Sequence, residues 1–295
     1  MRIGLKREDK YPVNQARVVF LVLVSENEIN KKDELIQRST FGQLHRQSIY
    51  WLKGDSSIQS PSFNSQSRTL SVPVEEIQSN ILEKTILGID WLLQNEDFDL
   101  LVRTNVSSYF TAIPTSIVKK FSNKDKSILG GFLEMHLTKY AEQARDRSFI
   151  SGSGIFMNRT ACQELTYCDT KKYMGIPDDI AISHFLRCKG SEIVFVRRGN
   201  IHLTGIFFPY AYMRLKSSID SDRTRQRMMR VHEYFSAKSI SRRVTLWISF
   251  QLDEIRYFSK SVNRKEEVMK NFWPSRKVVL LNAFRRVTGY QGKIK

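Results

Sequence analysis

The sequence predicts an α/β domain built on a mostly parallel central sheet. Short apolar runs alternate along the chain with segments of helical periodicity, which is the pattern of strands and helices packed in layers. The first run, 18–24, is continuously apolar and rich in Val, as expected of a central strand covered on both faces. A length of 295 residues and a hydrophobic content of 41% suit one large domain with an appendage.

The first half of the chain contains the clearest helix. After the first strand, a helix is predicted near 33–43 and a second strand at 48–53. Residues 54–68 are rich in Ser, Gln and Asn and are predicted to form a loop. The helix at 74–94 follows from apolar residues that recur at helical spacing, with charged residues between them.

A strand at 98–102 is predicted to end at the polar tripeptide Arg103-Thr104-Asn105. The later elements are a helix near 115–121, strands at 128–136 and 149–157, helices beginning near 159 and at 179, and a last strand at 192–196. Ligands of parallel α/β sheets bind beyond the carboxyl ends of the strands, so the tripeptide is a candidate ligand site. A polar turn without function is the alternative.

The chain changes character from about residue 236, where Arg and Lys mix with Trp, Phe and Tyr. We predict a main domain at 1–235 and a basic helical extension at 236–295. Helices of this composition pack as an extension of a domain or lie on an anionic membrane surface, and both interpretations remain open.

The net charge of the chain indicates which classes of partner it attracts. The 47 Lys and Arg residues exceed the 30 Asp and Glu residues and give a net charge of +17, which attracts nucleic acids, anionic lipids or phosphorylated small molecules. No aromatic RNA-binding run, helix-turn-helix or Cys/His finger is present, so we expect no nucleic-acid partner. A solvated basic surface is the plain alternative.

The compartment is predicted from what the sequence lacks. The three cysteines are odd in number and show no CxxC spacing, which suits a reducing compartment. We find no signal-peptide pattern and no apolar run long enough to span a bilayer. We therefore expect a cytoplasmic protein, peripheral on the inner face of a membrane if it binds one.

Four segments stand in an order that resembles a known family. They are EIQSNILEKT (76–85) with the downstream Trp91, FDLLVRTN (98–105), SGSGIFM (151–157) and PDDIAI (177–182). Together they are similar to the core of the β-1,3-galactosyltransferase and fringe-like group, glycosyltransferase family 31, over roughly residues 74–190. The resemblance implies a GT-A fold and a UDP-sugar donor.

The resemblance also implies roles for individual residues. Arg103-Thr104-Asn105 stands where the family has an acidic triplet that binds metal and donor. Asp179 aligns with the catalytic base, and Asp178 is its neighbour. The other implied positions are Ser153 and Gly154 near the donor, and Asn105 with His202 at the metal. An aspartate that caps the helix beginning near 179 is the structural alternative.

The tripeptide departs from the family because it has no carboxylate. Asn105 offers a carbonyl oxygen but no charge to Mn²⁺ or Mg²⁺, whereas the planar fork of Arg103 suits a diphosphate. Metal dependence is therefore open. Arg214 and Lys216 are candidates to clamp the diphosphate or a lipid-linked pyrophosphate, with a solvated surface as the alternative.

These features favour an inverting transferase that moves a hexose or N-acetylhexosamine from a UDP-sugar to a glycan or lipid-linked acceptor, in surface polysaccharide biosynthesis. Two other functions remain open. The charge is also typical of a basic nucleic-acid-binding protein. The lost carboxylates are also typical of a catalytically inactive glycosyltransferase-fold interaction module.

Overall fold

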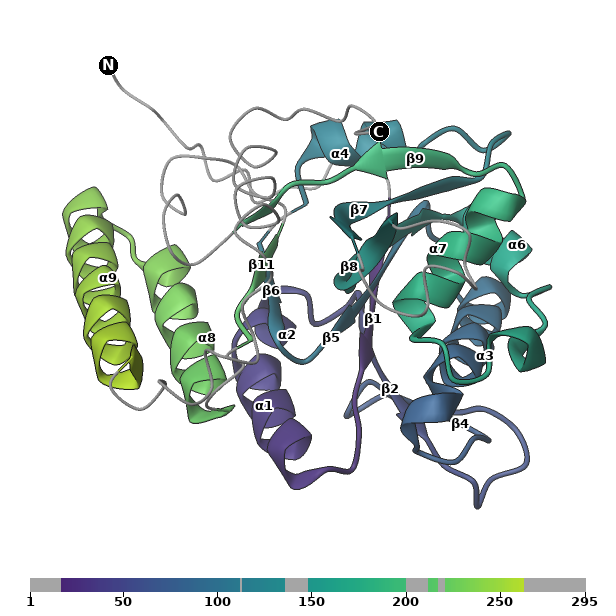
Figure 1. The fold of residues 1–295 in the computed structure, drawn as a ribbon, viewed down its shortest axis with the longest axis horizontal. Helices are drawn as coiled ribbons and strands as arrows, with labels where there is room; N and C mark the ends of the chain where they lie inside the picture. Colours follow the sequence, from purple (N-terminus) through teal and green to yellow (C-terminus); the bar gives the residue numbers. More distant parts are fainter. Residues whose placement is uncertain (1–16, 112, 136–147, 200–211, 217–220, 263–295) are drawn as a thin grey trace. The chain divides into compact units, whose positions relative to one another are not determined.

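The computed structural model describes residues 17–111, 113–135, 148–199, 212–216 and 221–262 (Figure 1). The chain divides into two compact units, residues 1–238 and residues 239–295. The boundary expected at residue 236 stays a prediction.

An eight-stranded sheet forms the centre of the first unit, with the order β3-β4-β2-β1-β5-β8-β7-β9. Its strands are β1 Val18–Leu23, β2 Ile49–Gly54, β3 Ser62–Asn64, β4 Thr69–Val72, β5 Leu100–Asn105, β7 Ile128–Met135, β8 Ser148–Asn158 and β9 Glu192–Phe195. β8 is antiparallel to both β5 and β7, and β3 is antiparallel to β4; the other pairings are parallel. The remaining strands β1, β2, β4, β5, β7 and β9 thus share one direction, which confirms the mostly parallel α/β class.

A small second sheet continues from the end of β5. It consists of β10 Arg198–Gly199, β11 Tyr212–Arg214 and β6 Ser108–Phe110, in that order. β11 pairs antiparallel with β6, so Arg214 lies opposite Ser108. Segments a hundred residues apart in sequence therefore meet beside the carboxyl end of β5.

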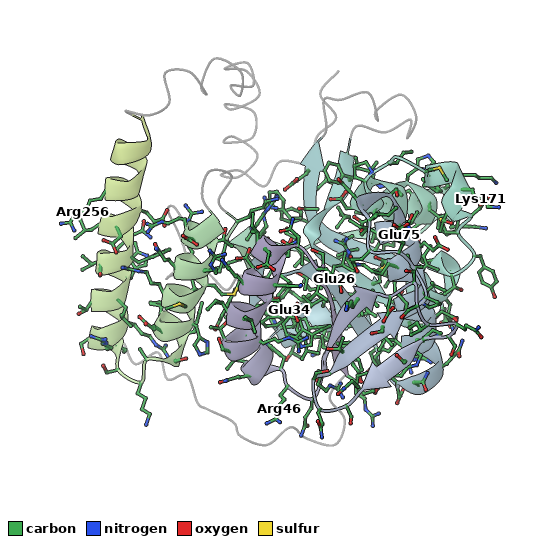
Figure 2. The ribbon with its side chains drawn as sticks, turned by 90° about the horizontal axis from the view of Figure 1, so that it is seen from below. Glu26, Glu34, Arg46, Glu75, Lys171 and Arg256 are labelled. Carbon is green, nitrogen blue, oxygen red and sulfur yellow. The ribbon has the colours of Figure 1, made fainter. Side chains whose placement is uncertain are left out.

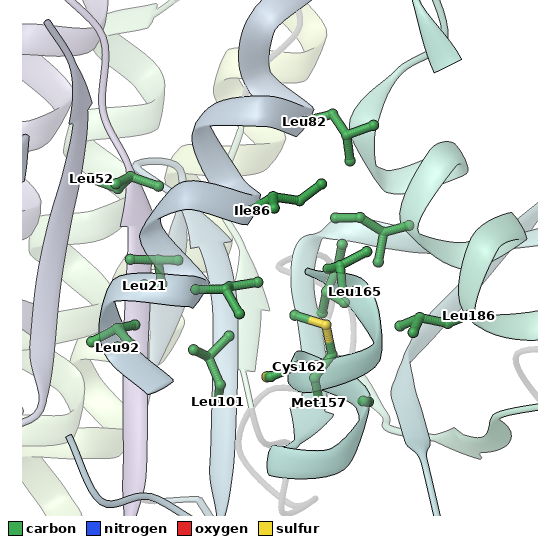
Figure 3. Close-up of a cluster of buried hydrophobic side chains, with 14 of the residues drawn as sticks. Leu21, Leu52, Leu82, Ile86, Leu92, Leu101, Met157, Cys162, Leu165 and Leu186 are labelled. Carbon is green, nitrogen blue, oxygen red and sulfur yellow. The ribbon is translucent and has the colours of Figure 1, made fainter. Parts of the chain in front are cut away.

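Helices cover both faces of the large sheet (Figure 1). The helices of the first unit are α1 Glu28–Ser39, α2 Phe41–Leu44, α3 Ile81–Asn95, α4 Thr115–Lys120, α6 Arg159–Leu165, α7 Asp178–Cys188 and α8 Ser221–Ser236, with short 3-10 turns at Gln78–Asn80 and Thr170–Tyr173. Side chains of β1 alternate between the two faces. Leu21 joins the cluster under α3, α6 and α7 (Figure 3), while Phe20 packs edge-on against Phe41 and Phe110 on the other face. Each fully buried Leu or Phe contributes about 1.5–3 kcal/mol.

The cluster under α3 explains why this helix forms. Leu82, Ile86, Ile89 and Leu92 are buried at helical spacing and meet Leu101 of β5 among others (Figure 3). Charged side chains such as Arg46, Glu75 and Lys171 lie at the outside of the unit (Figure 2). The amphipathic pattern of the sequence is thus converted into one buried and one solvated face.

Three boundaries differ from the expectation. The helix expected from 74 begins at Ile81, because the carboxylate of Glu76 binds the Gly54 amide at 2.6 Å and holds that segment across the strand ends. The first helix begins at Glu28, where Asn27 accepts from the Ile29 amide. The loop expected at 54–68 contains the strand β3, which pairs with β4.

The described part of the second unit is a single helix, α9 (Ile240–Val262). Four apolar residues recur at every fourth position and are exposed: Ile240, Val244, Ile248 and Leu252. Among the described residues, no helix is both long and apolar enough to cross a membrane.

Candidate active site

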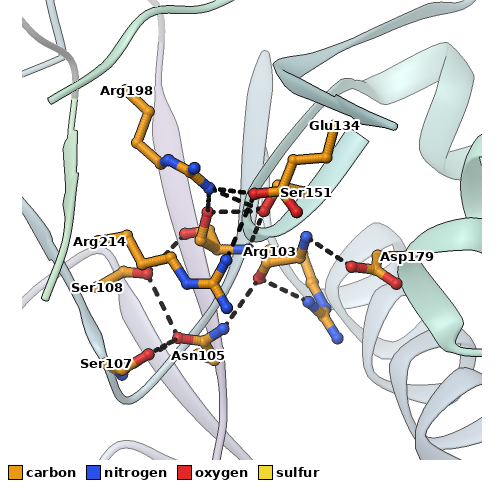
Figure 4. Close-up of polar contacts among 11 residues, drawn as sticks. Arg103, Asn105, Ser107, Ser108, Glu134, Ser151, Asp179, Arg198 and Arg214 are labelled. Carbon is orange, nitrogen blue, oxygen red and sulfur yellow. Dashed lines mark hydrogen bonds and ion pairs between the residues drawn. The ribbon is translucent and has the colours of Figure 1, made fainter. Parts of the chain in front are cut away.

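The tripeptide Arg103-Thr104-Asn105 forms the end of β5 itself. Its side chains reach the neighbouring strand β8 (Figure 4). Thr104 Oγ1 donates to the Ser153 carbonyl at 2.8 Å, and Arg103 Nη1 donates to the Gly152 carbonyl at 2.8 Å. Asn105 Nδ2 donates to the same Gly152 carbonyl at 3.3 Å. The tripeptide therefore fixes the backbone of Gly152-Ser153.

Arg103 is an interior residue. Only 4% of its side chain is exposed, and its Nη2 forms an ion pair with Asp178 of α7. Both terminal nitrogens of the guanidinium thus have partners within the protein. A direct contact between Arg103 and a diphosphate stays a prediction; in the structure this cation neutralises a carboxylate.

Asp178 and Asp179 open helix α7, but neither is its cap residue. Pro177 occupies the cap and provides no side-chain hydrogen bond. Asp179 instead accepts from two backbone amides, through Oδ2 from Gly152 at 2.9 Å and through Oδ1 from Ile180 at 3.0 Å. The structure therefore brings the aspartate pair of one motif to the glycine segment of another.

The pKa of Asp179 is raised from 3.8 to about 6, and burial is the largest cause. The negative charge of Asp178 also contributes to the increase, while the charge of Arg103 and the hydrogen bond from the Gly152 amide oppose it. A carboxylate with a pKa near 6 is a stronger base than an ordinary aspartate and is still mostly ionised at neutral pH. Asp179 therefore has the properties of a general base.

The glycines of β8 make room for other side chains. A Cβ at Gly152 would lie 2.8 Å from Arg103 Nη1 and 3.0 Å from Asp179 Oδ2. A Cβ at Gly154 would lie 2.8–3.2 Å from the ring of Tyr212. The lack of a Cβ atom at these two glycines thus lets Arg103, Asp179 and Tyr212 pack against the strand.

Gly152→Ala is expected to raise the pKa of Asp179 above its wild-type value and to cost about 1–3 kcal/mol of stability. The added methyl group pushes the carboxylate away from the Gly152 amide, which is a contact that lowers this pKa. Carboxyl-detected NMR titration and urea unfolding measure the two effects. An unchanged titration with unchanged stability would mean that β8 shifts without cost and does not position Asp179.

A second buried ion pair ties the strand ends to α3. Lys84 Nζ lies 2.5 Å from Glu76 Oε1 and donates to the Val24 carbonyl at 2.9 Å. Burial lowers the pKa of Lys84, and the charge of Arg103 also lowers it. Lys84 is therefore close enough to Arg103 for their charges to interact. Lys84, the lysine of the EKT run, therefore has a structural role: it connects α3 to the segments at the strand ends.

One polar cluster beside these residues was missed by the sequence analysis. Glu134 at the end of β7 meets Arg198, whose Nη1 lies 3.1 Å from Ser151 Oγ and 3.2 Å from Ser153 Oγ (Figure 4). The sequence does place both residues near strand ends, because Glu134 and Arg198 each stand at or just after the carboxyl end of a predicted strand. Only the sheet order places the two strand ends side by side.

The two predicted clamp residues lie in different surroundings. Arg214 Nη1 lies 3.4 Å from Glu134 Oε1 and so belongs to the missed cluster. Lys216 is exposed, and its charge acts on Asp33 of α1, which also pairs with Arg225 of α8 at 3.0 Å. The structure thus joins Arg214, but not Lys216, to the strand ends through a described contact.

The residues described at this edge do not fit a divalent metal. Asn105 Oδ1 accepts from the Ser107 amide at 3.1 Å and from the Ser107 and Ser108 hydroxyls at 2.7 and 3.3 Å. Within the described ranges, no group of three or more His, Cys, Asp or Glu side chains is arranged to hold a metal ion. His202, the other predicted ligand, lies outside these ranges.

No protein-family model and no curated protein sequence matches this chain. Its fold is similar to that of galactosyltransferase LgtC in complex with donor and acceptor sugar analogs, at 8% identity and a TM-score of 0.43, over 71% of this chain and 95% of LgtC. It is also similar to a glycosyltransferase involved in glycosylation of the major capsid of PBCV-1, at 10% identity and a TM-score of 0.43, over 72% of this chain and 98% of that one. A third similarity is to mannosyltransferase PcManGT from Pyrobaculum calidifontis in complex with GDP-Man and Mn²⁺, at 9% identity and a TM-score of 0.41, over 95% of this chain and 82% of that one. All three are similarities of fold between chains that share 8–10% of their residues.

Proposed function

We propose that this protein is an inverting glycosyltransferase that moves a hexose or N-acetylhexosamine from a UDP-sugar to a hydroxyl of a glycan or lipid-linked acceptor. The observation that carries the proposal is Asp179, a carboxylate with a pKa near 6 at the carboxyl edge of the parallel strands. The resemblance of four ordered motifs to glycosyltransferase family 31 supports the same reaction.

The chemistry needs one base. Ionised Asp179 accepts the proton of the acceptor hydroxyl. At the same time the oxygen of that hydroxyl attacks the anomeric carbon of the donor. The new bond from carbon to the acceptor oxygen forms as the bond from carbon to the phosphate oxygen breaks, and UDP leaves with the electron pair. Attack from the face opposite UDP inverts the anomeric configuration. Gly152 and the Arg103–Asp178 pair hold the base in place.

The departing diphosphate carries negative charge that the protein must stabilise. Arg214, beside the strand ends, meets this charge in the proposed reaction. Arginine is suited to this role because its guanidinium stays charged and binds phosphate oxygens in a planar fork.

A membrane-bound acceptor fits the basic character of the chain. The net charge is +17, and α9 exposes an apolar stripe with Arg242 and Arg256 on the same helix. Such helices bind anionic surfaces through both apolar burial and charge. We therefore extend the proposal to surface polysaccharide synthesis at the cytoplasmic face of a membrane.

Incubation with a panel of nucleotide sugars and candidate acceptors tests the function by release of nucleoside diphosphate. We expect release with a UDP-sugar at similar rates in Mn²⁺ and in EDTA, because the described donor atoms do not form a metal site. Loss of release in EDTA, restored by Mn²⁺, would contradict the metal-independent form of the proposal. If no donor is bound and none releases nucleoside diphosphate, the enzyme hypothesis is rejected and the inactive interaction module remains. Salt-dependent binding of oligonucleotides without UDP binding would favour the nucleic-acid-binding alternative.

A further inference from the structure

Glu134 lies between two arginines. Its Oε1 is 2.6 Å from Arg198 Nη1 and 3.4 Å from Arg214 Nη1 (Figure 4). Two guanidinium charges thus share one carboxylate, which leaves an excess positive charge in this cluster. The side chains of Arg198, Glu134 and Arg214 are 12%, 27% and 37% exposed, so the cluster is partly open to solvent, most of all at Arg214.

Two serine hydroxyls lie beside Arg198 in this cluster. Arg198 Nη1 donates to Ser151 Oγ and to Ser153 Oγ, and the two hydroxyl oxygens lie 3.0 Å from each other. The guanidinium of Arg198 stacks at 4.0 Å over the ring of Phe132, which fixes its plane. A guanidinium preorganised in this way binds phosphate oxygens through charge-assisted hydrogen bonds.

The cluster lies close to the base of the proposed reaction. The charge of Glu134 contributes to the raised pKa of Asp179, so the two carboxylates share one electrostatic field. Ser151 and Ser153 flank Gly152, whose amide binds Asp179. A phosphate group bound by Arg198 and Arg214 would therefore lie near the point of proton transfer.

We propose that Glu134 is an internal anion that holds the diphosphate position, and that a diphosphate ester displaces it to bind Arg198 and Arg214. The inference rests on the proposed function for its identity as a donor subsite. The exchange replaces one carboxylate by a group of higher charge and turns Glu134, at the partly exposed end of β7, toward water. Arg198 is then a binding residue that the sequence motifs do not reveal.

Calorimetric titration with inorganic pyrophosphate tests the exchange. Glu134→Gln keeps the size of the side chain and removes the competing charge, so we expect pyrophosphate to bind about 10-fold more tightly than to the wild type. Glu34→Gln is the matched control, because Glu34 is also part-buried and accepts from an arginine, Arg38, at 2.7 Å. Equal or weaker binding to Glu134→Gln than to the wild type would overturn the inference.

Arg214→Gln provides a second test of the anion site, at a side chain that is more exposed than Glu134 or Arg198. We expect this variant to bind pyrophosphate about 10-fold more weakly, since it loses one of two charged donors. An affinity equal to that of the wild type would reject the site. Parallel titrations with UDP and with farnesyl pyrophosphate separate the two sources of a diphosphate: the larger gain in Glu134→Gln identifies either the nucleotide donor or a lipid-linked acceptor as the natural ligand.

Failure of this inference and failure of the proposed function give different results. If a UDP-sugar is consumed in an Asp179-dependent way but Glu134→Gln gains no affinity, the inference is wrong and the transferase stands. If pyrophosphate binds Glu134→Gln more tightly but no sugar is transferred, the anion site stands without the reaction.

Discussion

Asp179→Asn is expected to abolish transfer, with a fall of about 100- to 10,000-fold in kcat, which is the usual contribution of a general base. Donor affinity should change little, because Asn keeps an oxygen that accepts from the Gly152 amide at the wild-type geometry. Single-turnover transfer and UDP titration measure the two quantities. Transfer at the wild-type rate would remove Asp179 from the role of base.

The same variant is expected to be more stable than the wild type above pH 6, by roughly 1–3 kcal/mol. The pKa of Asp179 is raised from 3.8 to about 6 by folding, so the folded protein binds this proton more tightly than the unfolded chain does. The stabilising contribution of the protonated group is therefore complete below pH 4 and is lost as the pH rises to about 6. Asn carries no charge at any pH and avoids this loss.

Urea unfolding at pH 4, 5, 6 and 7 measures the pH dependence. The stability difference between Asp179→Asn and the wild type should grow between pH 4 and pH 6 and then remain constant. Asp33→Asn is the matched control, since burial also raises the pKa of Asp33, but this residue lies on α1 beside Arg225. It should alter stability with pH and leave transfer intact; loss of transfer in both variants would attribute the effect to folding.

The sequence was sufficient for those parts of the fold whose cause is local. The run at 18–24 predicts β1 because every side chain in it is apolar, and the structure buries this strand on both faces. The spacing of Ile86, Ile89 and Leu92 predicts α3 for the same reason. The start of α3 was misplaced because the segment before it is held by Glu76, whose partner Gly54 is 22 residues away.

The site divides in the same way. The Asp178-Asp179 pair was recognised because the motif is continuous in sequence. The end of β5 was placed too early because a charged residue normally ends a buried strand, whereas Arg103 is neutralised by Asp178, 75 residues later. Glu134 and Arg198 are 64 residues apart and meet only because β7 lies between β8 and β9. No periodic pattern encodes such a contact.

Arg103→Met is expected to destabilise the protein by about 3–5 kcal/mol, because it leaves the Asp178 carboxylate without its partner in a largely buried position. The double variant Arg103→Met, Asp178→Leu should recover most of this loss, since apolar groups that replace a buried ion pair are often neutral or stabilising. Urea unfolding of the wild type, both single variants and the double variant gives the coupling energy. Losses that simply add would mean that the pair is not coupled.

The double variant also decides between the two roles of Arg103. If the arginine supports the site from within, the double variant folds and binds UDP with nearly the wild-type affinity, because the charge that meets the diphosphate lies elsewhere. If Arg103 binds the diphosphate itself, UDP affinity stays low although stability has returned. The equivalent pair Arg225→Met, Asp33→Leu is the control for the loss of a largely buried ion pair. We expect the first result, because both terminal nitrogens of Arg103 are already bound to Asp178 and to the Gly152 carbonyl.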